Sequence, residues 1–332
     1  MPLSYWSLTA YLDNTPMLSE PHGSAITYVN WASGVYFPNM QVISGLRFRN
    51  TANVSRLFWV GYSVEDNAGN WFDAQPTPVR VPAYSESTTQ NETWNVPQGP
   101  LPDSGYFNAV LAVWLSPPEK AGAVRLDQVE RFQAFQAFSF VETFVDPNSN
   151  TWRIGVHALG RSQLLTSNVG YTAKGLTFKL SANKYEGGEI GSSTLYLYGS
   201  YEAQIMCPTA PGSICTFFLY QPNVGDRADE IDIEIYNDGS RLIQFSTWVG
   251  GERTNYALGI LSFDPSAAYH NYRIEFYPGR LSFLVDDHPM QTWASGLPSH
   301  PMSIMFNAWW PYWLQGQNPP VDTYMYVAWV RH

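Results

Sequence analysis

The sequence has few basic residues and no long apolar run. It contains 18 Lys and Arg against 28 Asp and Glu, a net charge of −10. Nucleic-acid binding needs clustered basic side chains, and no such cluster occurs. No stretch of roughly 20 apolar residues could span a membrane, and residues 1–4 lack the charged and then apolar pattern of a signal peptide. We therefore expect neither a nucleic acid nor a membrane as partner.

Cysteine is also scarce, with only Cys207 and Cys215 in the chain. They frame a turn-like segment, residues 208–214, between two expected strands. A hairpin disulfide and a pair of free thiols both fit this spacing. The six histidines do not show the spacing of zinc ligands, so no zinc site is expected.

Against these absences stands one conspicuous pattern, residues 229–235, in which acids alternate with isoleucines. In a strand, Glu230, Asp232 and Glu234 would share one face and the isoleucines the other, buried face. Like charges in a row raise each other's pKa and destabilise a fold, so the pattern indicates chemistry. Glycoside hydrolysis uses paired carboxylates of this kind. A solvated acidic strand face and a calcium site are the alternatives.

From about residue 140 to residue 332, the chain resembles glycoside hydrolase family 16. Residues 230–234 match the uninserted form of the family motif, Glu-x-Asp-x-Glu. Further stretches match family strands in the right order: residues 187–190, 198–203, 216–220, 269–276, 284–287 and 303–309. The resemblance implies a concanavalin-like β-jelly-roll sandwich and a double-displacement reaction that retains anomeric configuration.

The resemblance also implies the catalytic roles. Glu230 would be the nucleophile, Glu234 the general acid and then base, and Asp232 the assisting acid between them. Because three adjacent carboxyls cannot all ionise cheaply, we expect Glu234 to hold its proton near neutral pH while Glu230 stays charged. Their titrations should be coupled.

Substrate binding is expected to use aromatic and polar side chains near these acids. Trp309 and Asn307 match family cleft positions, and strand alternation places Trp248 on the face of Gln244 and Ser246. Glu189 matches a cleft glutamate of the lichenase branch, but the usual arginine two places later is Gly191 here. The predicted substrate-binding residues are Glu189, Gln244, Trp248, Asn307 and Trp309. For any single tryptophan, core packing is the alternative.

The aromatic cluster at residues 309–313, with four aromatics around Pro311, is expected to line a loop near the cleft. A hydrophobic plug between two domains is the alternative.

The uninserted motif favours mixed-linkage β-1,3-1,4-glucan as the substrate of an endo-β-glucanase. Residues 284–289 are also similar to the xyloglucan branch, so xyloglucan hydrolysis or transglycosylation is the alternative, with endo-β-1,3-glucanase activity as another. From a different class, a non-catalytic, lectin-like glucan-binding protein could share the fold. The intact trio of acids argues against it, because burying unneeded carboxylates costs stability.

The length of 332 residues suffices for two buried cores. Residues 139–332 are the expected catalytic jelly roll, and residues 1–138 read as short strands separated by turns, typical of an immunoglobulin-like β-sandwich. This all-β accessory domain could bind carbohydrate through Trp59, Trp71 or Trp94. It could equally be a spacer, or support the catalytic domain through Phe132, Phe135 and Phe138.

No cofactor is expected. Many family members hold a calcium ion with an aspartate of the last strand, but the matching residue here is Ala328, so weak calcium binding or none is expected. The polymeric substrate implied by the resemblance suggests a secreted protein, and we expect a monomer.

Overall fold

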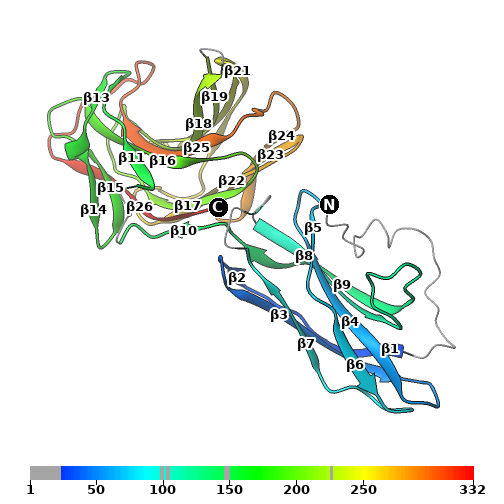
Figure 1. Ribbon diagram of the computed structural model, residues 1–332. Coiled ribbons are helices and arrows are strands. Elements are labelled where there is room, and N and C mark those ends of the chain that lie inside the picture. The colour runs from blue at the N-terminus through cyan, green and yellow to red at the C-terminus, as the bar shows by residue number, and fades with distance from the viewer. Residues whose placement is uncertain (1–23, 98–100, 102–104, 146–149, 225–226) are drawn as a thin grey trace. The chain divides into compact units, whose positions relative to one another are not determined.

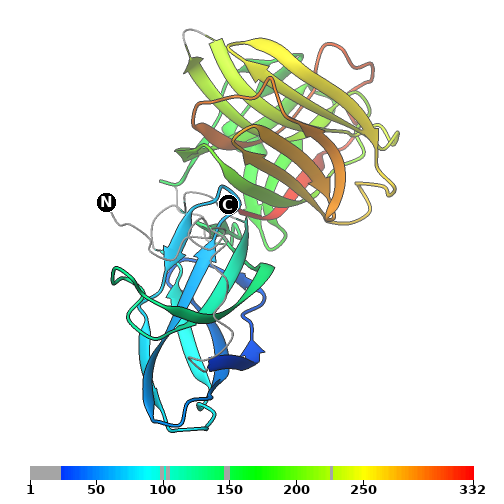
Figure 2. The ribbon, with the colours of Figure 1, turned by 90° about the vertical axis from the view of Figure 1, so that its right-hand side faces the viewer.

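The structure is a computed structural model that describes residues 24–97, 101, 105–145, 150–224 and 227–332. The chain divides into two compact units, residues 1–140 (unit 1) and residues 141–332 (unit 2). Both consist of β-strands, and η1 (Thr166–Asn168), a 3-10 helix, is the one helical element of the described residues (Figures 1 and 2). Within the described ranges, no helix has the length and apolar character to cross a membrane.

Unit 1 contains two sheets, one of order β1-β3-β7 and one of order β2-β9-β8-β4-β5 with β6 paired to β4. The strands are β1 (Ser24–Asn30), β2 (Val35–Tyr36), β3 (Gln41–Asn50), β4 (Arg56–Glu65), β5 (Trp71–Asp73), β6 (Thr77–Val81), β7 (Gln90–Asn95), β8 (Gly105–Trp114) and β9 (Arg125–Ala137).

Strand alternation builds the core of unit 1. On β4, Phe58, Val60, Tyr62 and Val64 are fully buried and join a cluster that takes side chains from both sheets. Trp59 lies on the other face, where it packs against Ala112 and Trp114 in a smaller cluster. The two faces of this strand therefore contribute to different clusters.

One expectation for unit 1 is wrong because the side chain is buried. Trp94 is 5% exposed and packs against the rings of Phe107 and Phe135, so it cannot offer a flat platform to a sugar. Phe135 belongs to the same core, and Phe138 is fully buried. Only Phe132 of the three phenylalanines is exposed, at 73%.

Unit 2 contains two larger sheets stacked face to face (Figure 1). The outer sheet has the order β14-β15-β26-β17-β22-β23-β24, with β10 paired to β26. Its strands are β10 (Val141–Glu142), β14 (Val169–Thr172), β15 (Gly175–Leu180), β17 (Gly199–Met206), β22 (His270–Tyr277), β23 (Arg280–Val285), β24 (His288–Trp293) and β26 (Thr323–Arg331).

The inner sheet has the order β12-β13-β16-β25-β18-β19-β20-β21, with β11 paired to β16. Its strands are β11 (Trp152–Ile154), β12 (Ala158–Leu159), β13 (Ser162–Leu164), β16 (Glu186–Tyr196), β18 (Ile214–Val224), β19 (Arg227–Tyr236), β20 (Leu242–Val249), β21 (Glu252–Ile260) and β25 (Met302–Trp309).

The isoleucines of β19 fix which way the acids of that strand point. Ile231, Ile233 and Ile235 are fully buried, and burial of each such side chain contributes about 1.5–3 kcal/mol to stability. Next to them, Phe245 of β20 packs on Phe283 of β23, with ring centroids 4.8 Å apart, which joins the two sheets. Since side chains alternate along a strand, the acids of β19 must lie on the opposite face, away from the core.

The two cysteines of unit 2 are free thiols in this structure. Cys215 is on β18, and Cys207 follows β17; both are buried. Burial raises the pKa of the Cys207 thiol well above its usual value, and the neighbouring Cys215 thiol raises it further. Of the two possibilities left open by the spacing, the structure has the unbridged pair.

Candidate active site

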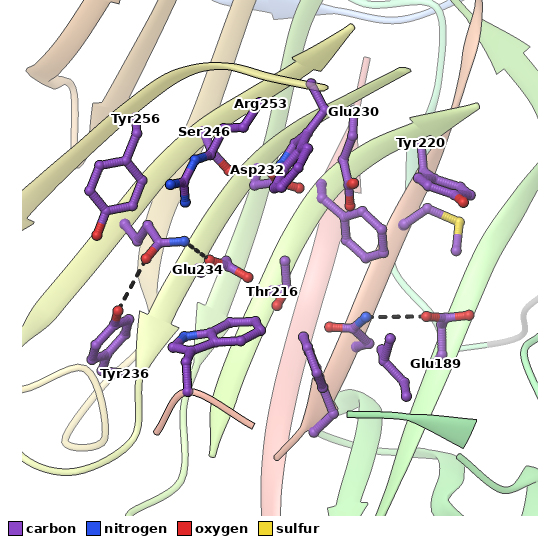
Figure 3. Close-up of a pocket in the computed structure, with 18 of the residues that line it drawn as sticks. Glu189, Thr216, Tyr220, Glu230, Asp232, Glu234, Tyr236, Ser246, Arg253 and Tyr256 are labelled. Carbon is purple, nitrogen blue, oxygen red and sulfur yellow. Dashed lines mark hydrogen bonds between the residues drawn. The ribbon is translucent and has the colours of Figure 1, made fainter. Parts of the chain in front are cut away.

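The register of the inner sheet gathers the predicted acids with polar and aromatic side chains from the neighbouring strands. Glu230, Asp232 and Glu234 of β19 lie opposite Trp248, Ser246 and Gln244 of β20, respectively. On the other side, β18 sets Tyr220, Phe218 and Thr216 against the same three acids. Figure 3 shows the trio pointing into one cavity. The predicted common face of Gln244, Ser246 and Trp248 is confirmed.

The cavity is a cleft of about 770 Å³ over the inner sheet. It is lined by the predicted residues Glu189, Glu230, Asp232, Glu234, Gln244, Trp248, Asn307 and Trp309. It is also lined by residues that the sequence analysis did not name, among them His157, Thr216, Tyr220, Tyr236, Arg253 and Tyr256. A cleft of this size with many aromatic walls suits an extended ligand with apolar faces and polar edges.

Hydrogen bonds hold the three carboxyl groups of the trio in place. The Ser246 hydroxyl and the Trp248 indole N–H donate to Asp232, and Glu230 shares a hydrogen bond with Asp232. The Gln244 amide donates to Glu234 and accepts, in turn, a hydrogen bond of 3.1 Å from the Tyr236 hydroxyl (Figure 3). The carboxyl groups therefore have defined orientations before any ligand binds.

Burial raises the pKa of all three carboxyls, and repulsion from neighbouring charges raises the pKa of Glu230 and Glu234 further. Burial raises the pKa of Asp232 to about 6. Burial, and then the charge of Asp232, raises the pKa of Glu234 to about 8, although Arg253 and the Gln244 amide act in the opposite direction. For Glu230, burial is followed by the charges of Asp232, Glu234 and Glu189, which together raise its pKa well above the usual range.

The expected contrast between a charged Glu230 and a protonated Glu234 is therefore not found in the free protein. The alternation of acids predicted the repulsion but not how deeply the walls of the cleft enclose Glu230. Both glutamates are pushed toward the protonated form, and the pKa of Asp232 is lower than that of Glu234.

A polar row crosses the sheet from β16 to β20 beside these acids. Glu189 pairs in register with Asn307, Asn307 with Thr216, Thr216 with Glu234, and Glu234 with Gln244. The Thr216 hydroxyl oxygen and the Asn307 amide oxygen are buried and have no hydrogen-bond partner among the described residues. Because such atoms are normally satisfied, they indicate where ligand hydroxyl groups can bind.

The predicted arrangement of the aromatic cluster at residues 309–313 is correct only in part. Trp309 and Trp313 line the cleft and pack edge to face, with centroids 5.4 Å apart. Trp310 is fully buried against Tyr185 and does not line the cleft. Tyr312 is 74% exposed. The change of direction after β25 sends successive rings to opposite sides of the chain.

Some of the missed lining residues could have been found by extending the same alternation. Thr216, Phe218 and Tyr220 share one face of β18, just as the acids share one face of β19. His157 could not, since it lies outside the named strands, and only the fold brings it to the cleft.

In the part of the chain that the structure describes, no three His, Cys, Asp or Glu side chains are grouped as a metal site requires. Ala328, which stands where the resemblance places a calcium-binding aspartate, lies on β26.

Comparison with known proteins gives a consistent result. The model of glycosyl hydrolases family 16 matches residues 161–330. The chain is 30% identical over 241 residues to the beta-glucanase of Bacillus subtilis (strain 168), a match that covers 69% of this chain and 94% of that protein. It is 31% identical over 157 residues to the xylanase/beta-glucanase of Ruminococcus flavefaciens, 45% of this chain but only 20% of that protein.

Among solved structures, the beta-glucanase of Bacillus licheniformis superposes with a TM-score of 0.54 and 28% identity. The match covers 58% of this chain and 96% of that structure. The all-β, jelly-roll-like fold expected for the second part of the chain is thereby confirmed.

Proposed function

Because the chain belongs to glycosyl hydrolases family 16, we propose that it is an endo-β-1,3-1,4-glucanase that cleaves mixed-linkage glucan with retention of anomeric configuration. The observation that carries the proposal is the trio of Glu230, Asp232 and Glu234 on one face of β19, at the floor of an open cleft. The relatives from Bacillus subtilis and Bacillus licheniformis are both named beta-glucanase, which supports the choice of substrate.

In the proposed mechanism, Glu230 attacks the anomeric carbon while Glu234 protonates the leaving glycosidic oxygen, so that a covalent glycosyl-enzyme forms and the aglycone departs. Glu234 then removes a proton from water, which attacks the same carbon and releases Glu230. The raised pKa of Glu234 keeps its proton available at neutral pH.

Asp232 has a definite part in this proposal. A protonated Glu230 cannot attack, and the structure raises its pKa. The hydrogen bond between Glu230 and Asp232 provides a route by which the shared proton can lie on Asp232, leaving the charge on Glu230. Substrate in the cleft, with positive charge developing at the anomeric carbon, would favour that arrangement.

We further propose that residues 1–138 form an immunoglobulin-like accessory domain, since unit 1 has two sheets around one core. Trp59 and Trp71 remain its candidate carbohydrate contacts, because both are only partly buried. A polymeric glucan is found outside cells, so we infer that the protein is secreted, and we propose that it acts as a monomer.

Proton NMR tests the mechanism by showing the anomeric configuration of the reducing ends that form first. We expect newly formed β-anomers that later equilibrate, and we expect Glu230→Gln to lower kcat at least about a thousandfold. Initial α-anomers would overturn the double-displacement mechanism. Undiminished turnover by Glu230→Gln would overturn the role of Glu230.

A further inference from the structure

Glu189 is held on both sides at the end of the cleft away from Arg253 and Tyr256 (Figure 3). Its Oε1 lies 2.9 Å from His157 Nε2, and its Oε2 accepts a hydrogen bond of 3.1 Å from the Asn307 amide. An ionised carboxylate offers about four acceptor sites, so two remain for ligand hydroxyls. The Asn307 amide oxygen, which has no partner among the described residues, lies beside them.

His157 faces acceptors with both ring nitrogens. Nε2 faces the Glu189 carboxylate, and Nδ1 lies 3.2 Å from the Ala158 carbonyl oxygen. A neutral imidazole has one N–H, so only the protonated ring can donate both hydrogen bonds. Burial lowers the pKa of His157, but the hydrogen bonds to Glu189 and Ala158 and the charge of Glu189 outweigh it and raise the pKa above its usual value.

The chain is tightly packed around Glu189 at Gly155 and Gly191, and His157 is the group that contacts Oε1 of its carboxylate. A Cβ atom added at Gly155 would lie 2.3 Å from Glu189 Oε1, and one added at Gly191 would lie 2.3 Å from Met305 Sδ. Position 191, where the resemblance leads one to expect an arginine, is thus occupied in space by Met305. His157 is instead 32 residues away in sequence and supplies the cationic contact.

We propose that His157 is a positioning residue that holds Glu189 in place for the hydroxyl groups of a bound sugar, and that its protonation strengthens glucan binding. The inference rests on the proposed function. The ionisable groups near the pair are Glu189 itself on β16, Tyr220 on β18 and Glu230 on β19; the charges of Glu189 and Glu230 also raise the pKa of Tyr220.

The sign of the pH dependence follows from the raised pKa of His157. The ring is protonated below its ordinary pKa of 6.5 and loses its proton as the pH rises through the higher value in the folded protein. The neutral ring keeps one N–H, so His157 can no longer donate to both Glu189 and Ala158, and its contact with Glu189 loses the positive charge. Binding of glucan should therefore be tightest at low pH and weaken as the ring deprotonates, apart from the titration of the catalytic trio.

The test measures the Kd of a mixed-linkage tetrasaccharide by calorimetry between about pH 5 and pH 9. Glu230→Gln is the parent, so that no turnover occurs, and it is compared with the same protein carrying His157→Gln. We expect His157→Gln to weaken binding about tenfold at low pH, with the two curves converging at high pH.

His300→Gln is the matched control. His300 Nδ1 lies 2.9 Å from the buried Asp229 Oδ2, and its side chain is 51% exposed against 47% for His157, but it does not line the cleft. The Glu230→Gln protein that also carries His300→Gln should bind the tetrasaccharide as the parent does.

Curves for the parent and His157→Gln that stay parallel, or that coincide, would overturn the inference while leaving the proposed function intact. A parent that binds no tetrasaccharide, together with a wild type that cleaves no glucan, would refute the proposed function and this inference with it.

Discussion

Individual side chains around Glu234 determine the pKa of its carboxyl group, and the proposed mechanism needs this carboxyl to carry a proton. Burial and Asp232 raise the pKa of Glu234, whereas Arg253 of β21, two strands away in the same sheet, lowers it. Arg253 also lies over the rings of Tyr256, at 4.6 Å, and Trp248, at 5.8 Å. The guanidinium is thus held near Glu234 by contacts with two aromatic faces.

Replacing Arg253 should therefore move the alkaline limb of the pH profile. In Arg253→Met, the pKa of Glu234 should rise further, because the positive charge that favours ionisation is gone. Since the general acid must be protonated, the fall of kcat/KM at high pH should shift upward from its position near about pH 8 in the wild type.

Arg280→Met is a suitable control, since Arg280 is on β23 of the outer sheet and pairs with Glu275 there. Its alkaline limb should coincide with that of the wild type. A limb that stays in place or moves down in Arg253→Met would contradict the assignment of Glu234 as the general acid.

The sequence predicted the trio of acids because a period of two in one strand is a local property. It predicted Gln244 and Trp248 because they lie on the next strand along the chain, where alternation still applies. His157 was missed because its partner Glu189 is 32 residues away and its loop has no periodic pattern. The raised pKa of Glu230 was missed because it depends on the walls of the cleft.

At the scale of the element, β19 combines a stabilising face with a costly one. Its isoleucines are fully buried between the sheets, while Asp232 and Glu234 are 4% and 8% exposed on the opposite face. Desolvated carboxyls with raised pKa values destabilise the folded protein when they ionise. The strand therefore gives up stability to keep the acids together in the cleft.

Glu234→Gln should make the protein more stable, and the gain should grow with pH. The pKa of Glu234 is about 8 in the folded protein, against an ordinary value of 4.5. Its protonated form supports stability below the unfolded value, and that contribution is lost as the pH rises through about 8. The amide does not titrate, so the gain in unfolding free energy at pH 8 should be on the order of 1–3 kcal/mol.

Urea denaturation of wild type and variant at about pH 5 and pH 8 measures this. The comparison at low pH is the internal control, because there Glu234 is largely protonated in the folded state. A variant that is less stable than the wild type at pH 8 would mean that the carboxylate is stabilised, not strained, in the cleft.

For elements as for residues, the sequence was informative where a pattern repeats. Strand alternation predicted the buried isoleucines of β19. Trp94 looked like a candidate surface platform because composition alone cannot distinguish an exposed ring from one packed against Phe107 and Phe135 in a core. The different fates of Trp309, Trp310 and Trp313 follow from the turn after β25, which the sequence does not define.

At the scale of the whole molecule, the cleft is built from unit 2. Every residue that lines it lies between His157 and Trp313, and unit 2 has its own core between two sheets. Unit 1 likewise has a separate core. Chemistry on a soluble glucan should therefore need only unit 2.

A chain reduced to residues 141–332 should fold and retain kcat/KM on soluble mixed-linkage glucan within about a factor of two, since domains with their own cores can fold alone. Circular dichroism verifies folding, and reducing-sugar release measures the rate beside the full chain. A folded but inactive fragment would show that residues 1–140 contribute directly to catalysis or binding.

The most direct test of the central claim is analysis of the products from barley mixed-linkage glucan, laminarin and tamarind xyloglucan, with Glu230→Gln as the control. We predict discrete short oligosaccharides from mixed-linkage glucan, and none with the variant. Cleavage chiefly of laminarin or xyloglucan would keep the trio and contradict the substrate. Binding without products from any of the three would contradict catalysis and favour a lectin.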